Sequence, residues 1–163
     1  MVTPPGPNAG AALPPSLAAT DIRDVMRGRT LGLARVGTVL VLAHDVQPPA
    51  AEEWTRYCQA IATHHASLTG QLVLAEGAGP DAAQRQQVLD GVIAHYQKGA
   101  PTPPTAVLTR SLMVRGVVTL FNWFTPRAMR AFAPDDLRGA AEHMRLSEEQ
   151  LRRLVSIGEA LRP

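Results

Sequence analysis

The chain has 163 residues, enough to form one domain around a single hydrophobic core. Its 16 Lys and Arg nearly balance its 14 Asp and Glu, which argues against the strong positive field that a nucleic acid attracts. Cys58 is the single cysteine, which excludes an intramolecular disulfide and a multi-cysteine zinc site and fits a reducing compartment.

The sequence also lacks the signals of secretion and membrane insertion. Its first ten residues have neither the basic segment nor the apolar run of a signal peptide. The longest apolar run, residues 112–124, is interrupted by Arg115 and Asn122 and falls short of the roughly 18 residues of a spanning helix. We therefore expect a cytoplasmic protein that is not an integral membrane protein.

Two kinds of segment open the chain. Residues 1–19 contain five prolines among Ala and Gly, which predicts a disordered tail ahead of a single α/β domain over residues 20–163. Residues 20–30 are polar, and Ile22, Val25 and Met26 have the spacing of one or two helical turns. This spacing predicts a short lead-in helix.

A β-hairpin and a first long helix come next. The hairpin is predicted over residues 31–36 and 38–43, with Gly37 in the reversal. The second strand is apolar at every position, which indicates burial on both faces of a sheet. Pro48 and Pro49 then begin a helix whose apolar residues recur at steps of three and four.

Strands and helices alternate over the rest of the chain. Residues 71–75 and 105–109 are predicted strands, and residues 128–132 a short edge strand. The helices between and after them have recognisable first residues, which are Asp81, Ser111, Asp136 with its neighbour Asp135, and the capping box of Ser147 and Gln150. The predicted fold is α/β, a β-hairpin followed by alternating helices and strands in a mixed four- to five-stranded sheet covered by helices, with an extra C-terminal helix.

This order resembles a known family over about residues 31–144. The matching segments are the hairpin TLGLARVGTVLVLAHD, the helix entry PPAAEEW and the closing RAMRAFAPDDLRGAAEHM. Together they resemble the STAS fold of anti-sigma-factor antagonists and their SpoIIAA-like relatives, a group shared with Sec14-type lipid carriers. The resemblance implies a regulatory protein that binds other proteins.

The antagonists carry a phosphorylated Ser or Thr where the strand after the first long helix turns into the next helix. Here that junction is residues 75–81, AEGAGPD, without a hydroxyl group. Ser111, one strand later and at a helix start, is the substitute we consider for phosphorylation, because a phosphate is favoured at a helix amino terminus. The alternative role of Ser111, which we favour, is a helix cap.

The other reactive groups do not form a catalytic or metal-binding pattern. No HExxH or His-Cys spacing is present, so we predict no catalytic residue, no metal and no cofactor. His44 and Asp45 at a strand end, with Glu76, are the single set that we could propose for an enzyme. Cys58 has the pattern of a buried cysteine, and Gly77 and Gly79 that of an ordinary turn.

The helix over residues 112–124 carries more apolar side chains than one buried face requires. We therefore predict that it binds a protein partner or a second copy of the chain, using Arg115, Val118, Phe121, Trp123 and Phe124. The alternative is that the helix is buried on two sides, so that its apolar side chains serve the core and not a partner. A second functional hypothesis is a pocket for a small apolar or acidic ligand, as in the Sec14-related group, with an arginine meeting an acidic head group.

Overall fold

Six strands form one sheet in the part of the chain that the computed structural model describes, residues 21–97, 102–124 and 128–163. The strands lie in chain order across the sheet, β1 (Ile22–Arg27), β2 (Leu31–Val36), β3 (Val39–His44), β4 (Gly70–Leu74), β5 (Thr105–Leu108) and β6 (Met129–Phe132). The pairs β1/β2 and β2/β3 are antiparallel, and β3 to β6 are parallel. The α/β fold class predicted from the sequence is confirmed.

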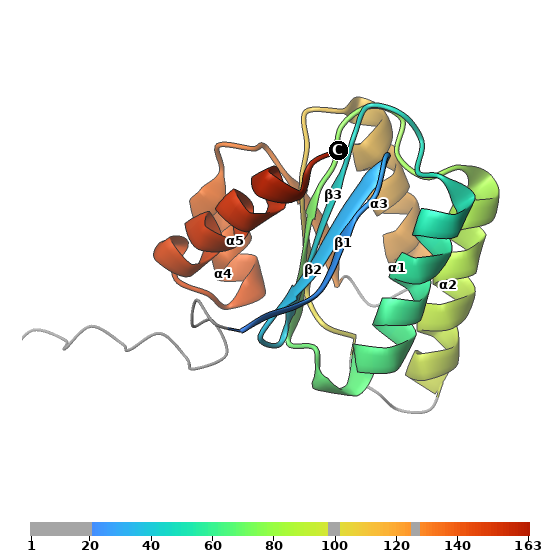
Figure 1. The fold of residues 1–163 in the computed structure, drawn as a ribbon, viewed down its shortest axis with the longest axis horizontal. Helices are drawn as coiled ribbons and strands as arrows, with labels where there is room; N and C mark the ends of the chain where they lie inside the picture. Colours follow the sequence, from blue (N-terminus) through green and yellow to red (C-terminus); the bar gives the residue numbers. More distant parts are fainter. Residues whose placement is uncertain (1–20, 98–101, 125–127) are drawn as a thin grey trace, which may run out of the picture.

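Helices cover both faces of the sheet, as Figure 1 shows. The helices α1 (Ala51–His64), α2 (Ala82–Gln97) and α3 (Leu112–Phe124) connect the parallel strands and share one face. A short 3-10 helix, η2 (His65–Ser67), follows α1. The last two helices, α4 (Leu137–Met144) and α5 (Glu148–Leu161), cover the opposite face.

The alternation of side chains on β3 explains the two covered faces. Val39, Val41 and Ala43 are buried in the core under α4 and α5. Leu40 and Leu42 are buried in a second core under α1, α2 and α3, and His44 lies on that same face because successive side chains of a strand alternate. The prediction that this strand is buried on both faces is confirmed.

Helix starts follow the predicted capping residues. The Asp81 carboxylate accepts a hydrogen bond from the Gln84 backbone N–H at 2.8 Å, and the Gln84 side-chain oxygen accepts one from the Asp81 N–H at 2.9 Å. Ser147 and Gln150 form the same reciprocal pair at α5. Asp136 caps α4 by accepting from the Gly139 N–H. These caps place the amino ends of α2, α4 and α5 where the sequence predicts them.

The prediction of a short lead-in helix is wrong, because this segment forms β1, a strand at the edge of the sheet. The hydrogen-bonding groups on the free side of β2 pair with β1, an interaction between segments that local spacing does not reveal. The register shifts between Arg23 and Met26, and Asp24 has a φ of 53°, so one extra residue interrupts the strand. The sheet therefore has six strands where we predicted four or five.

Two carboxylates hold β1 and the turn after it against β2 and the first helix. The Asp24 carboxylate accepts from Arg35 at 2.8 Å and lies 3.2 Å from Nε2 of His64. The Glu53 carboxylate accepts from the backbone N–H groups of Arg29 and Thr30 and from the Thr30 hydroxyl.

The predicted tail, residues 1–19, lies outside the described residues.

Candidate functional site

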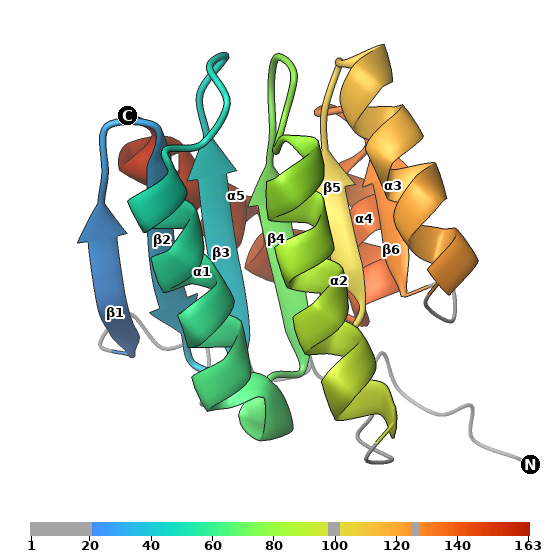
Figure 2. The same cartoon turned by 90° about the vertical axis from the view of Figure 1, so that its right-hand side faces the viewer.

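Helix α3 presents two apolar faces. Val114, Val118 and Phe121 are buried against the sheet. On the outer face, Leu112 is 84% exposed and Trp123 is 75% exposed, and Met113 and Phe124 are exposed to 62% and 56%. Figure 2 shows α3 at the β6 side of the helical layer, beside α2. One face of α3 is therefore core and the other is an unpartnered apolar surface within the described structure.

Two of the predicted partner residues belong to the inner face. Val118 and Phe121 are each 5% exposed, so in this conformation they contact the core and do not reach a partner at the surface. The helical period explains this result, since residues 114, 118 and 121 share one stripe while 123 and 124 lie on another. Trp123 and Phe124 keep the exposure that the partner hypothesis requires.

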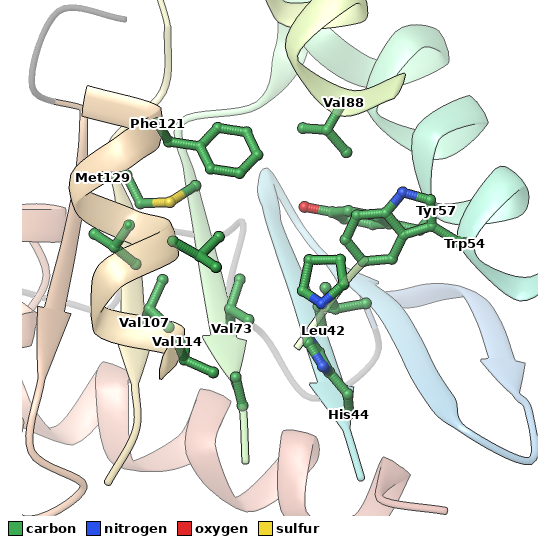
Figure 3. Close-up of a pocket in the computed structure, with 14 residues that line it drawn as sticks. Leu42, His44, Trp54, Tyr57, Val73, Val88, Val107, Val114, Phe121 and Met129 are labelled. Atoms are coloured by element: carbon green, nitrogen blue, oxygen red, sulfur yellow. The ribbon is translucent and has the colours of Figure 1, made fainter. Parts of the chain in front are cut away.

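An apolar cavity of about 50 Å³ lies between the inner face of α3, the sheet and the helices α1 and α2. Figure 3 shows its lining, to which β3 contributes Leu42 and His44, α1 contributes Trp54 and Tyr57, and α2 contributes Val88. The strands β4 and β5, helix α3 and strand β6 complete the wall with Val73, Val107, Val114, Phe121 and Met129. This cavity is far smaller than the roughly 300–1,000 Å³ of ordinary ligand pockets.

Among the side chains that line this cavity, His44 has a buried polar atom without a hydrogen-bond partner. It is 3% exposed, and its buried Nδ1 atom has no hydrogen-bond partner. Its ring meets that of Trp54 edge to face, with centroids 6.3 Å apart. Burial lowers the pKa of His44 to about 4, and the nearby positive charge of Arg162 adds to the effect, so the imidazole is neutral at pH 7.

The other polar side chains around the cavity have partners. The Tyr57 hydroxyl accepts from the side-chain amide of Gln71, and burial raises the Tyr57 pKa. The Trp54 indole N–H donates to the Gln84 backbone oxygen at 2.9 Å. The alternation of side chains along β3 was the signal that could have placed His44 in the core, but the predicted strand ended at residue 43, one residue before His44.

Ser111 connects two loops at the carboxyl ends of the strands. Its hydroxyl donates to the Gly77 carbonyl at 2.6 Å and accepts from the Val114 N–H at 3.2 Å. Gly77 has a φ of +69°, and a β-carbon there would collide with the Val46 carbonyl. Ser111 therefore caps α3 and holds the turn before α2, and its phosphorylation stays a prediction.

Arg115 lies away from the apolar cavity. Its guanidinium donates to the Thr109 carbonyl at 3.3 Å, and its side chain borders a surface depression of about 570 Å³ beside β6 and α4. Arg130, Asp136 and Glu142 also border this depression, so its charges are mixed. Arg115 is not placed to meet a head group inside the cavity.

One arginine lies close to both His44 and Glu76. Arg162, which follows α5, donates to the His44 backbone carbonyl at 3.4 Å and lies 3.8 Å from the Glu76 carboxylate. Asp45 accepts from the Val46 N–H at 2.7 Å. The His44 imidazole is buried and lines the apolar cavity, whereas Asp45 and Glu76 are exposed, so the three side chains do not share one open site.

The surroundings of Cys58 do not favour a reactive thiolate. Cys58 is partly buried, and this burial raises its pKa to about 11, so the thiol is protonated at neutral pH.

Residues 21–97, 102–124 and 128–163 contain no group of three or more His, Cys, Asp or Glu side chains that could hold a metal ion. In the same ranges, no helix has both the length and the apolar character needed to cross a membrane.

The fold and the site define an α/β protein with a doubly covered sheet and two candidate binding regions, one on each side of α3. Compared with protein-family models and with curated proteins, the sequence matches none of them. Among solved structures, the fold is similar to that of an uncharacterized DUF3478-family protein from Shewanella loihica, described as having a SpoIIAA-like fold. The two chains share 17% identity with a TM-score of 0.48, and the match covers 74% of this chain and 89% of that one.

The description of that neighbour agrees with the SpoIIAA-like fold expected from the sequence.

Proposed function

We propose that the protein is a non-enzymatic interaction module that binds a second copy of itself through the outer face of α3. The observation that carries this proposal is the exposure of Trp123, at 75%, beside Phe124. Large aromatic side chains supply much of the binding energy of protein interfaces and are costly to leave in water. Leu112 and Met113 extend the apolar surface to the other end of the helix.

The arrangement of this face supports pairing with an identical copy. Leu112 and Trp123 lie eleven residues apart, which is about 17 Å along a helix. A two-fold axis across the middle of α3 would place the aliphatic end of one copy against the aromatic end of the other.

Gly116 supports the same arrangement. It is exposed at the middle of α3, and a β-carbon there would meet nothing within 4 Å in the same chain. Glycine inside a helix costs about 1 kcal/mol relative to alanine, so packing within the chain does not account for its presence. A partner helix crossing at this point would approach closely over a glycine.

The test is sedimentation equilibrium of the full chain over a wide range of concentration. We expect the mass to rise from monomer to dimer, and the Trp123→Ser variant to weaken the pairing by about 30-fold or more, the scale of an interface hot spot. Val25→Ser is the matched control, because Val25 is 52% exposed on β1 and far from α3 in the sheet order.

Two results would overturn the proposal. One is a wild-type protein that stays monomeric at every concentration. The other is a Trp123→Ser variant that pairs as tightly as the wild type. Since Trp123 is exposed, its replacement leaves the core intact, and circular dichroism of the variant checks that the fold is retained.

A further inference from the structure

The unpartnered Nδ1 atom of His44 gives the cavity a chemical preference. A buried polar atom without a hydrogen-bond partner costs about 1–3 kcal/mol, and such atoms are rare in native proteins. The imidazole of His44 lines the cavity at the carboxyl end of β3, and most of the other lining side chains are aliphatic or aromatic. A ligand atom that reached Nδ1 would therefore gain a hydrogen bond that the protein alone does not supply.

A second cavity of about 50 Å³ lies beside the first. The two share four lining side chains, Tyr57, Val88, Phe121 and Met129. The second continues past Gln71 and Thr105 toward the other end of the strands. Methionine is flexible and adapts to the shape of its neighbours, so a change of the Met129 or Phe121 rotamer would join the two spaces.

The size of the joined space limits the ligand. An apolar cavity of about 150 Å³ holds a benzene molecule, whereas the two spaces of about 50 Å³ together give about two thirds of that volume, so a separating side chain must move aside to supply the rest. A fatty acyl chain is much larger. The lining therefore fits a single aromatic ring rather than a lipid.

We propose that this cavity binds a small aromatic molecule with one hydroxyl group, whose ring lies among the apolar side chains and whose hydroxyl pairs with Nδ1 of His44. A hydroxyl both donates and accepts, so it satisfies Nδ1 in either tautomer of the neutral imidazole. The apolar walls favour the ring by removing its surface from water. The site uses the inner face of α3 and does not depend on pairing through the outer face.

Phenol and toluene are the probes that test this proposal, because they have nearly the same shape and toluene lacks the hydroxyl. Binding is followed by titrating each probe into the full chain and recording NMR signals of the lining residues. Replacing His44 with Leu removes the hydrogen bond and keeps an apolar side chain of similar size. We expect the ratio of phenol to toluene affinity to fall about two- to tenfold in His44→Leu, the effect of one net hydrogen bond.

His64→Leu is the control, since His64 lies at the end of α1 beside Asp24 and does not line this cavity. It should leave the ratio of affinities unchanged. The ring nitrogen signals of His44 in the wild-type protein give a second readout that needs no variant, and they should shift with phenol more than with toluene.

The proposal is overturned if neither probe gives saturable shifts at the lining residues. It is also overturned if the affinity ratio is the same in the wild type and in His44→Leu, or if phenol leaves the His44 ring signals unchanged. None of these outcomes depends on whether the protein is a monomer or a dimer in solution, so they test the cavity independently of pairing through α3.

Discussion

The buried imidazole of His44 makes stability depend on pH. In the folded protein its pKa is lowered from 6.5 to about 4, first by burial and then by Arg162. The unfolded chain therefore binds a proton on this residue as the pH falls below about 6.5, while the folded protein does not bind it until about pH 4. Stability that is complete above pH 6.5 is lost progressively between these two values.

The size of this loss follows from the two pKa values. Each pKa unit corresponds to about 1.4 kcal/mol, so the difference between 6.5 and about 4 gives a loss of roughly 3 kcal/mol. For a domain of this size, whose stability is about 5–15 kcal/mol, such a loss is easily measured by urea unfolding. The free energy of unfolding should be determined between pH 8 and pH 4 for the wild type and for His44→Leu.

The comparison of the two proteins isolates His44. The pKa values of Asp24 and Glu53 are also lowered. The pKa of Asp24 is lowered chiefly by its hydrogen bond from Arg35. Burial raises the pKa of Glu53, but the hydrogen bonds from Thr30 and Arg29 together outweigh burial and lower it. These carboxylates stabilise the fold above their unfolded pKa and lose that effect in acid, equally in both proteins. If wild type and His44→Leu lose stability in parallel from pH 7 to pH 4, the account of a buried neutral imidazole is refuted.

Three further substitutions test packing, capping and an open glycine. Gly158→Ala should lower the free energy of unfolding by about 1–3 kcal/mol, because its β-carbon would lie 2.6 Å from Leu74 Cδ1 under α5; denaturant unfolding measures this, and no loss would contradict the close contact. Ser111→Ala should cost about 1–2 kcal/mol by the same assay, and unchanged stability would refute the capping role. Gly91→Ala, with open space at the β-carbon, should add about 0.5–1 kcal/mol in thermal unfolding, and a loss would show hidden crowding.

Much of the fold could be predicted because its signals are local. The capping box at Ser147 and the apolar run of β3 depend on residues close together in the chain, and both are confirmed. The strand β1 was missed because its conformation is set by pairing with β2, and Ile22 and Val25 have a spacing compatible with a helix. Local spacing cannot report a hydrogen-bonded edge.

The site was less predictable for the same reason. An excess of apolar side chains on α3 could be seen in the sequence, but the division between Phe121 inside and Trp123 outside depends on how the helix lies on the sheet. The orphaned atom of His44 depends on which helices cover the end of β3. Such facts come from tertiary packing.

Acrylamide quenching of tryptophan fluorescence tests the central claim most directly. Trp54 is 4% exposed and Trp123 is 75% exposed, so in the monomer the quencher reaches Trp123 and not Trp54. If α3 pairs with a second copy, quenching should decrease as protein concentration rises and Trp123 becomes covered. Quenching that stays the same from dilute to concentrated protein would show that Trp123 remains in water and would contradict the account.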